Sequence, residues 1–375
     1  MTSTTAPLPE ADVERALAPL GEARMLPSAA YTDTDVLAWE REHLFAGEWV
    51  CIGREPGPVQ HAQRAVALGV GSALIVRAGA DLRAFANVCR HRGHELLSVG
   101  EHAQRAHIRC PYHGWTYGLD GSLERATGGA VRDAADCALG ALPVAEWLGW
   151  LFVSERGVAP PLHDRLRSLT DVLAPYDPAR LTTVARRDYV VDANWKVLHE
   201  NYQECLHCPR IHPELCRVSP PDSGDNLAPG DGWVGGWMDL RDGVETMSMS
   251  GTRVGPPHPG LDEHTRRRVA YFAVLPNLLI SAHPDYVLTH RLEPIAPGAT
   301  RIECEWLAEP DAEIDEAVEL WDTINEQDWD ACESVQRGLA SGAHRPGPIV
   351  EREDAVHHFV GLIAHAYLGR EQPGS

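Results

Sequence analysis

The sequence has little positive charge and no long apolar run. Its 33 Lys and Arg residues are outnumbered by 54 Asp and Glu residues, which gives a formal net charge of -21. This balance argues against sequence-independent nucleic-acid binding and against anchoring on an anionic membrane, because both depend on lysine and arginine, and it favours cationic ligands. The N-terminal stretch MTSTTAPLPEADVERALAPL has neither the basic nor the apolar region of a signal peptide, and no apolar run is long enough to span a bilayer. We therefore expect a cytoplasmic protein.

A dinucleotide-binding fingerprint and a disulfide framework are also lacking. Gly69, Gly71 and Gly79 lie among strand-like runs without the GxGxxG order, so no flavin or nicotinamide site is expected in this chain. The nine cysteines are scattered and odd in number, which fits a reducing compartment. Five of them are expected to pack in the interior: Cys51, Cys137, Cys216, Cys304 and Cys332. The 375 residues can bury a sizeable core, spread over two or three domains.

Two short motifs each pair one cysteine with one histidine. They are Cys89 with His91 in CRH, and Cys110 with His113 in CPYH. Two thiolates and two imidazoles on hairpin tips suit a Rieske 2Fe-2S cluster, in which the histidines raise the potential above that of an all-cysteine cluster. A structural zinc site is the alternative, but its usual C-x2-C and H-x3-5-H spacing is absent. The motifs therefore indicate electron transfer.

The residues after the second motif support a ligand loop on a hairpin. Pro111 would bend the loop, Gly114 would avoid crowding a cluster, and Asp120-Gly121 predicts a hairpin turn. The segments CRHRG and CPYHGWTYGLDGSL resemble the cluster loops of Rieske oxygenases. The eighteen residues between the two motifs are a slightly longer insert than this family usually shows.

The rest of the chain reads as a β-rich module inserted into a larger α+β body. Residues 33–46 carry apolar residues at helical spacing behind Asp33, which predicts a capped helix. From 49 to 153, short alternating runs broken by glycine predict antiparallel strands. The segment GVAPPLHD, at 157–164, is the expected linker.

Residues 194–213, NWKVLHENYQECLHCPRIHP, form a second constellation. Glu200, Glu204 and His207 fall three or four residues apart, so they can share one face of a helix. His212 would point away on an unbroken helix, but Pro209 pushes the preceding residue out of helical geometry. The chain can therefore turn and bring the two imidazoles together. Non-haem iron(II) oxygenases commonly add one carboxylate to such a pair.

The helical spacing of apolar residues between 314 and 339 indicates which carboxylate would complete the iron site. Asp328 lies within an apolar stripe at helical spacing, whereas Asp322, Glu326 and Asp330 lie off it and read as solvated. The stripe consists of Ile314, Ala317, Trp321, Ile324, Ala331, Cys332, Val335 and Leu339. A carboxylate facing a core is costly unless it is paired or bound to a metal. A salt bridge from Asp328 to a buried arginine, and ordinary hydrogen-bonded histidines, remain the alternatives.

The segment NWKVLHENYQECLHCPRIH is similar to the mononuclear-iron helix of Rieske oxygenase α subunits, and QDWDACESVQRGL to the helix that supplies their third ligand. This resemblance implies that His207, His212 and Asp328 bind iron(II) and that Glu204 bridges electron flow. It implies an α+β fold in which a β-rich Rieske domain, 47–158, is inserted into a helix-plus-antiparallel-sheet, helix-grip-like catalytic domain. The catalytic domain would comprise 159–375 with 1–46 as its N-terminal helical extension.

The family usually has aspartate where this chain has Glu204, and the glutamate resembles the branch that acts on quaternary ammonium compounds, including carnitine oxygenase. LPNLLISAHPDYVLTHRLEP and EDAVHHFVGL resemble betaine demethylases and choline monooxygenases. The resemblance implies a homotrimer in which His113 or His91 of a neighbouring subunit meets Glu204. It also implies dioxygen as co-substrate and a separate flavin and iron-sulfur NAD(P)H reductase, for which Arg90 and Arg92 are candidate docking residues.

The expected reaction is hydroxylation of an N-methyl group, followed by release of formaldehyde, on a small cationic substrate such as glycine betaine. A quaternary ammonium group would be recognised by aromatic faces. The candidates are Tyr202, Trp233, Trp237, Tyr271, Phe272, Tyr286 and Trp306. Arg291 and His290 are candidates for meeting a substrate carboxylate. Oxidation of an aromatic ring, a secondary metabolite or an amine nitrogen stays open, as does a Rieske electron carrier without oxygenase activity.

Overall fold

The computed structural model describes residues 5–55 and 61–370, and these divide into two compact units. One unit is continuous and spans 40–162, and the other combines the residues up to 39 with those from 163 onward. The first unit is therefore an insertion in the second, as the sequence predicts for a β-rich module. The predicted linker at 157–164 contains the point where the chain passes from one unit to the other.

The inserted unit is built from three small antiparallel sheets, with strand orders β1-β11-β10, β5-β2-β3-β4-β9 and β6-β7-β8. Its strands are β1 Trp49–Arg54, β2 Ala62–Ala67, β3 Ser72–Ala78, β4 Asp81–Ala86, β5 His102–Gln104, β6 Ile108–Arg109, β7 Thr116–Tyr117, β8 Leu123–Arg125, β9 Ala141–Leu142, β10 Val144–Trp147 and β11 Trp150–Ser154. The short 3-10 helix η3, Ala134–Cys137, follows β8. The expectation of antiparallel strands between 49 and 153 is confirmed.

The helix predicted at 33–46 is confirmed, with a change of type partway along. It begins as the α-helix α3, Thr34–Glu40, and continues as the π-helix η2, Arg41–Phe45. Asp33 caps it, because its side chain accepts a hydrogen bond from the backbone N–H of Asp35 at 2.7 Å.

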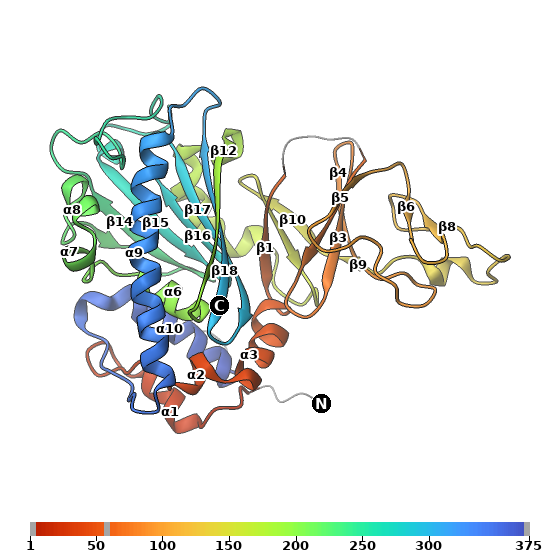
Figure 1. Ribbon diagram of the computed structural model, residues 1–375, viewed down its shortest axis with the longest axis horizontal. Helices are drawn as coiled ribbons and strands as arrows, with labels where there is room; N and C mark the ends of the chain where they lie inside the picture. Colours follow the sequence, from red (N-terminus) through yellow and green to blue (C-terminus); the bar gives the residue numbers. More distant parts are fainter. Residues whose placement is uncertain (1–4, 56–60, 371–375) are drawn as a thin grey trace. The chain divides into compact units, whose positions relative to one another are not determined.

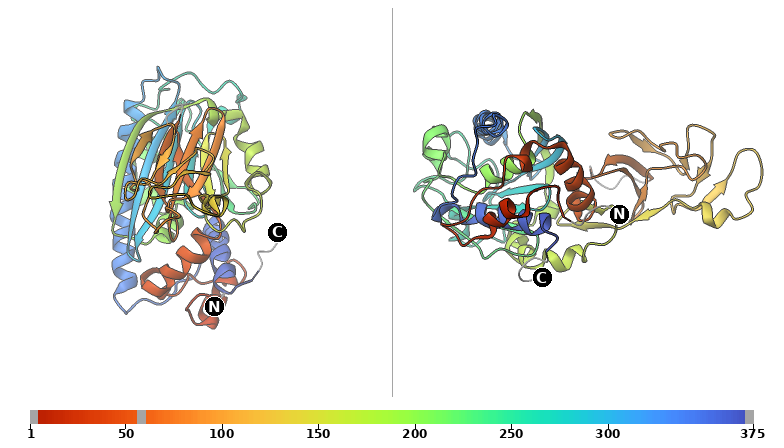
Figure 2. Two further views of the ribbon diagram at one scale, coloured as in Figure 1. Left: turned by 90° about the vertical axis from the view of Figure 1, so that its right-hand side faces the viewer. Right: turned by 90° about the horizontal axis from the view of Figure 1, so that it is seen from below.

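The other unit contains a seven-stranded antiparallel sheet of order β12-β18-β17-β16-β15-β14-β13, covered on one face by a long helix (Figures 1 and 2). Its strands are β12 Thr182–Val191, β13 Asp225–Asn226, β14 Trp233–Asp239, β15 Arg268–Val274, β16 Leu278–Ala282, β17 Val287–Ala296 and β18 Ala299–Ala308. The covering helix is α9, Asp315–Ala340. Helix α6, Trp195–Tyr202, and the short helices α7, Cys208–Ile211, and α8, Pro213–Val218, complete the region that carries the site.

The remaining helices lie before the sheet, between its strands β14 and β15, or after α9. Before it come α1 Glu10–Glu14, η1 Arg15–Leu17, α2 Ala29–Thr32, α4 Leu162–Arg165, α5 Arg167–Leu173, η4 Ala174–Tyr176 and η5 Pro178–Arg180. Later come η6 Thr265–Arg267, η7 Glu351–Glu353 and α10 Asp354–Tyr367. Within the described residues, no helix combines the length and the apolar character that crossing a lipid bilayer requires.

The apolar stripe of α9 is confirmed in its main part and wrong at one position. Val335 was expected on the buried face but is 50% exposed, and Gln336 is buried instead. The glutamine can be buried because both ends of its side-chain amide are hydrogen-bonded. Its Oε1 accepts a hydrogen bond from the backbone N–H of Asn194 at 3.0 Å, and its Nε2 donates one to the carbonyl of Tyr31 at 3.1 Å. Asp322, expected to be solvated, is only partly exposed and accepts a hydrogen bond from the Tyr189 hydroxyl.

The first and last described residues of this unit pack together. The backbone N–H of Ala6 donates to the carbonyl of Tyr367 at 2.8 Å, and Arg370 pairs with Glu10 and Glu14 at 3.0 and 2.6 Å. The N-terminal segment is thereby attached to the end of α10, so the unit is closed by residues from both ends of the sequence.

Candidate functional site

The two cysteine–histidine motifs lie on two loops that converge in the inserted unit. Cys89 follows β4, and Cys110 lies between β6 and β7. Both thiols are 2% exposed, while the imidazole rings of His91 and His113 approach each other with centroids 4.8 Å apart. The structure therefore brings all four predicted cluster residues to the tips of adjacent loops.

Each of the two loops is closed by a backbone hydrogen bond of the same pattern, from a glycine N–H to the carbonyl of the cysteine. Gly93 N–H donates to the carbonyl of Cys89 at 3.0 Å, and Gly114 N–H donates to the carbonyl of Cys110 at 3.1 Å. Both glycines have positive φ, 73° and 72°. Gly114 was expected because a side chain would crowd a cluster, but its positive φ already accounts for glycine at this position.

Neighbouring aromatic side chains contact two of the four donors, His91 and Cys89. The Trp115 ring stacks on His91 at 4.7 Å, and the Tyr117 hydroxyl lies 3.3 Å from the Cys89 sulfur. Burial raises the pKa of the Cys110 thiol, although the backbone N–H groups of His113 and Tyr112 oppose this. Partial burial, with His91 and Arg92 nearby, lowers the pKa of His113, which favours the neutral imidazole that binds a metal. This donor set fits a 2Fe-2S cluster held by two thiolates and two imidazoles.

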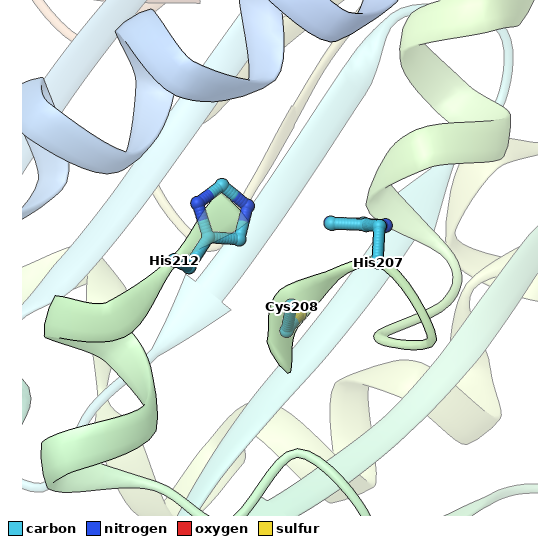
Figure 3. Close-up of side chains that lie close together, drawn as sticks. All are labelled: His207, Cys208 and His212. Carbon is cyan, nitrogen blue, oxygen red and sulfur yellow. The ribbon is translucent and has the colours of Figure 1, made fainter. Parts of the chain in front are cut away.

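The second candidate centre lies where α6 gives way to two short helices (Figure 3). Asn194 caps α6 by accepting the Lys196 N–H at 3.0 Å, and the helix ends at Tyr202. His207 is the N-cap residue of α7, and His212 lies between α7 and α8. The break expected at Cys208, before Pro209, is wrong, because both residues lie in α7; the chain is instead non-helical at 203–207 and at His212, which precedes Pro213. The two imidazole centroids nevertheless lie 5.2 Å apart.

Asp328, from α9, meets both imidazoles. Its Oδ1 lies 2.9 Å from His212 Nε2 and 3.4 Å from His207 Nε2. The alternative of a salt bridge between Asp328 and a buried arginine does not apply, because its partners are the two histidines and the Asn201 amide at 3.1 Å. Two imidazoles and one carboxylate on one face are the donor set typical of non-haem iron(II) sites.

The opposite nitrogen of each imidazole is held by its own acceptor. His207 Nδ1 lies 2.5 Å from Glu204 Oε1, and His212 Nδ1 lies 2.7 Å from Gln327 Oε1. An acceptor at Nδ1 keeps the proton there and leaves Nε2 free to bind a metal. Gln327 was not predicted, because its position next to Asp328 carries no signal until the helix is placed against His212.

Electrostatics stabilise the charged form of this cluster. Burial alone would raise the pKa of Asp328, but hydrogen bonds and charge from His207 and His212 lower it overall. Burial likewise acts to lower the pKa of His207, while Asp328 and Glu204 raise it to about 9. Two carboxylates beside one imidazole thus make the site attractive to a cation.

Glu200 is not part of this cluster. It was expected to share a helix face with Glu204 and His207, which is wrong because α6 ends before either of them. Its side chain accepts a hydrogen bond from the Tyr31 hydroxyl at 2.7 Å instead. Burial raises the pKa of Glu200 to about 8, against the lowering effect of Tyr31 and Lys196.

Cys205 and Cys208, on either side of His207, form a disulfide with a Cα–Cα distance of 5.0 Å. The pairing was not predicted, although the spacing C-x-x-C is visible in the sequence. Figure 3 shows Cys208 between the two histidines, and its sulfur and their ligand atoms all lie within 4.8 Å of one another. The five cysteines expected to pack in the interior take no part in the disulfide, and three of them are buried: Cys51, Cys304 and Cys332.

A pocket of about 680 Å³ opens onto the His207, His212 and Asp328 cluster. Its aromatic lining consists of Tyr202, Trp237, Tyr271 and Trp321. The first three were predicted, whereas Trp321 was assigned only to the apolar stripe of α9.

Four of the predicted aromatic residues are not among the lining residues: Trp233, Phe272, Tyr286 and Trp306. Trp233 and Phe272 pack against each other at 5.6 Å, Tyr286 stacks on His283 at 4.0 Å, and Trp306 is fully buried. Because these rings are enclosed by the protein interior, they have no face left for a ligand. They are core residues, as is common for large aromatic side chains.

The pocket is rich in carboxylates and poor in cations. Besides Glu204 and Asp328, it is lined by Asp222, Asp225, Glu351 and Asp354. Arg352 is the single arginine or lysine among its described lining residues. Neither of the two residues predicted to bind a substrate carboxylate lines the pocket. Arg291 pairs with Glu303 at 3.2 Å, and His290 Nε2 lies 3.0 Å from the Asn325 amide oxygen.

Known proteins resemble the chain in both units. The family model "Ring hydroxylating alpha subunit (catalytic domain)" matches residues 178–369, and "Rieske [2Fe-2S] domain" matches 48–132. The glycine betaine monooxygenase oxygenase subunit of Chromohalobacter salexigens is 31% identical over 389 residues, covering 92% of this chain and 86% of that protein. The carnitine monooxygenase oxygenase subunit of Acinetobacter baumannii is 37% identical over 194 residues, covering 50% and 52%.

Solved structures also share the fold. A quaternary ammonium Rieske monooxygenase, described in connection with carnitine oxidation by gut microbiota, superposes with a TM-score of 0.80 at 25% identity, covering 97% of this chain and 100% of that one. Naphthalene 1,2-dioxygenase from Rhodococcus superposes with a TM-score of 0.77 at 22% identity, covering 97% and 99%, which shows likeness of fold alone.

Proposed function

Because the chain belongs to the α subunits of ring-hydroxylating oxygenases with a Rieske domain, we propose that it hydroxylates an N-methyl group of a quaternary ammonium compound. Glycine betaine is the first candidate substrate. The hemiaminal formed by hydroxylation would release formaldehyde and leave the demethylated amine. The observation that carries this proposal is a pocket lined by aromatic rings and carboxylates beside two histidines and one aspartate.

Proteins of this family contain a Rieske 2Fe-2S cluster and a mononuclear iron. We infer that Cys89, His91, Cys110 and His113 hold the cluster, and that His207, His212 and Asp328 hold the iron. When bound, the cluster supplies electrons and the iron activates dioxygen for attack on the substrate.

The protein's own side chains orient this second centre. Glu204 and Gln327 keep a proton on Nδ1 of each histidine, so that both Nε2 atoms face Asp328. The three donors occupy one side and leave the pocket side to dioxygen and substrate.

Recognition of the substrate cation would fall to the aromatic rings. Tyr202 is fixed by hydrogen bonds of its hydroxyl to Ile280 O at 2.8 Å and to Ser281 at 2.9 Å. Tyr202 and Tyr271 meet edge to face at 6.0 Å, and Tyr271 and Trp321 do so at 6.4 Å. A quaternary ammonium group has no N–H to donate, so it is recognised by ring faces and by opposite charge.

Trp237 already binds a cation on one side, since the Arg268 guanidinium lies 4.7 Å from its ring centroid. Only its other face is available to a ligand. For a betaine, we propose that Arg352 in the pocket lining meets the carboxylate, in place of Arg291 and His290.

We also propose a homotrimer in the cytoplasm, supplied with electrons by a separate flavin and iron-sulfur NAD(P)H reductase. The family resemblance and the acidic Glu204 support an arrangement in which His113 or His91 of a neighbouring subunit hydrogen-bonds Glu204. Arg90 and Arg92 flank His91 and are exposed, which suits a docking spot for the reductase on an acidic protein.

Tryptophan fluorescence titration with glycine betaine, proline betaine, choline and carnitine tests the substrate class. We expect a saturable change with at least one of them, and formaldehyde release with that compound in the presence of a reductase. The response should weaken in Trp237→Phe and persist in Trp306→Phe, because only the first ring lines the pocket. No response to any of the four compounds would contradict the proposal.

A further inference from the structure

We propose that Tyr286 is a positioning residue for the substrate cation, although its own ring does not line the pocket. Its hydroxyl holds the indole of Trp321, and Trp321 is the ring against which the methylated ammonium group packs. The inference rests on the proposed function, because it names the residues that recognise the cation. It also accounts for the hydroxyl of Tyr286, since a phenylalanine of almost the same shape could fill the core there.

A directed chain of hydrogen bonds runs from the pocket wall into the interior. Trp321 Nε1–H donates to the Tyr286 hydroxyl oxygen at 2.8 Å, and the Tyr286 hydroxyl donates to the carbonyl of Met247 at 2.6 Å. An indole has no other polar atom, so a ligand in the pocket meets only carbon on this ring. Hydrogen bonds in such a chain polarise one another, which leaves more electron density on the indole and strengthens its attraction for a cation.

Tyr286 is itself held in place by its surroundings. Its ring stacks on His283, with centroids 4.0 Å apart and planes 12° apart. The preceding residue, Asp285, accepts a hydrogen bond at 2.6 Å from the side chain of Thr246, which directly precedes Met247. The carbonyl that accepts the Tyr286 hydroxyl therefore belongs to a segment fastened to the neighbour of Tyr286, so the hydroxyl has a fixed partner.

The position of Trp321 on α9 places it on the same side of the pocket as the carboxylate proposed to bind iron. Asp328, Ile324 and Trp321 all line the pocket and are four and three residues apart, so they share one face of the helix. Seven residues correspond to roughly 10.5 Å along the helix axis, a separation that can accommodate a trimethylammonium group between the aspartate and the indole.

Trp321 is better suited to this role than the other rings of the pocket. Tryptophan attracts a cation more strongly than tyrosine or phenylalanine does. Of the two tryptophans that line the pocket, Trp237 already has the Arg268 guanidinium 4.7 Å from its ring centroid, which weakens its attraction for a second cation. Tyr271 meets Trp321 edge to face at 6.4 Å and supports the tilt of the indole.

Calorimetric titration of the full-length protein with glycine betaine and with tert-butylacetate tests the inference. The two compounds share their shape and their carboxylate, but the quaternary nitrogen of one is a carbon in the other, so the ratio of their Kd values measures recognition of the cation. The protein carries its cluster and iron(II), and dioxygen is excluded. We expect the unaltered protein to prefer glycine betaine, and Tyr286→Phe to lower that preference about fivefold without a change in iron(II) affinity.

Two further variants separate positioning from a general loss of packing. Tyr189→Phe removes a hydroxyl that donates to Asp322, the residue next to Trp321 on α9. It should keep the preference of the unaltered protein, because Asp322 is not among the described lining residues. Trp321→Phe should lower the preference, and adding Tyr286→Phe to it should lower the preference no further, because the hydroxyl acts through the indole.

An unchanged preference in Tyr286→Phe, or additive losses in the double variant, would overturn the inference and leave the proposed function standing. An equal loss in Tyr189→Phe would also overturn it, because any hydroxyl removed beside α9 would then have the same effect. Equal binding of the two compounds by the unaltered protein would instead refute recognition of a quaternary ammonium group in this pocket, and the inference with it.

Discussion

Gln327 is predicted to control the affinity of the mononuclear site although it touches no metal. Its Oε1 lies 2.7 Å from His212 Nδ1, and its Nε2 donates to Glu214 at 3.2 Å. Gln327→Met keeps the length of the side chain and removes the acceptor. The His212 ring then loses the group that fixes its proton on Nδ1, so Nε2 is no longer held towards Asp328.

Loss of such an outer partner typically weakens metal binding roughly 10- to 100-fold, which corresponds to about 1.4–2.8 kcal/mol. The effect should lie towards the upper end, because His212 is fully buried and has no solvent to replace the acceptor. Gln327→Glu retains an acceptor oxygen and should lose far less affinity.

Iron(II) affinity is measured by competition with a chelator, and the cluster signal in electron paramagnetic resonance reports that the other centre is intact. Glu326→Gln, an exposed neighbour on the same helix, serves as the control and should bind iron like the unaltered protein. An affinity of Gln327→Met within twofold of the unaltered protein would refute the reasoning, as would equal losses in Gln327→Met and Gln327→Glu.

Three further outcomes are expected. Glu204→Gln should keep both metal centres, because an amide oxygen can still accept from His207 Nδ1, yet nearly abolish coupled turnover; unchanged turnover would contradict the bridging role. Glu200→Gln should gain stability relative to the unaltered protein as pH rises from 4.5 to 8, because a carboxyl whose pKa is raised to about 8 costs stability once the unfolded chain ionises; urea unfolding across this range checks the sign, and a flat difference would oppose it. Gly114→Ala should destabilise the ligand loop by about 1 kcal/mol, because φ is 72°, and should lower the visible absorbance of the cluster; full absorbance would count against it.

The grouping of the residues proposed as ligands could be predicted from the sequence because their signals are local. Each cysteine–histidine pair lies within four residues, and His207 and His212 lie five residues apart. Asp328 was recognisable because a carboxylate interrupts an apolar stripe of the correct period. These features depend on spacing along the chain, which the sequence shows directly.

The pocket could not be assembled in this way, because its lining depends on register between distant strands. Tyr271 lines the pocket while the adjacent Phe272 packs in the core, as the alternation of a strand requires. The sequence shows the alternation but not which face is hollow. Gln327 and the burial of Gln336 were missed for a related reason: a glutamine becomes informative only when its partner on another element is known.

The hydrogen bond between Ala6 and Tyr367 has a consequence for synthesis of the protein on the ribosome. The inserted unit is one continuous stretch and can fold as soon as it emerges. Residues 5–39 have to wait for the end of α10, roughly 200 residues after the inserted unit ends, or ~10–40 s at ordinary translation speed. The loops around Cys89 and Cys110 would therefore be ready to receive iron and sulfide while the other unit is still being made.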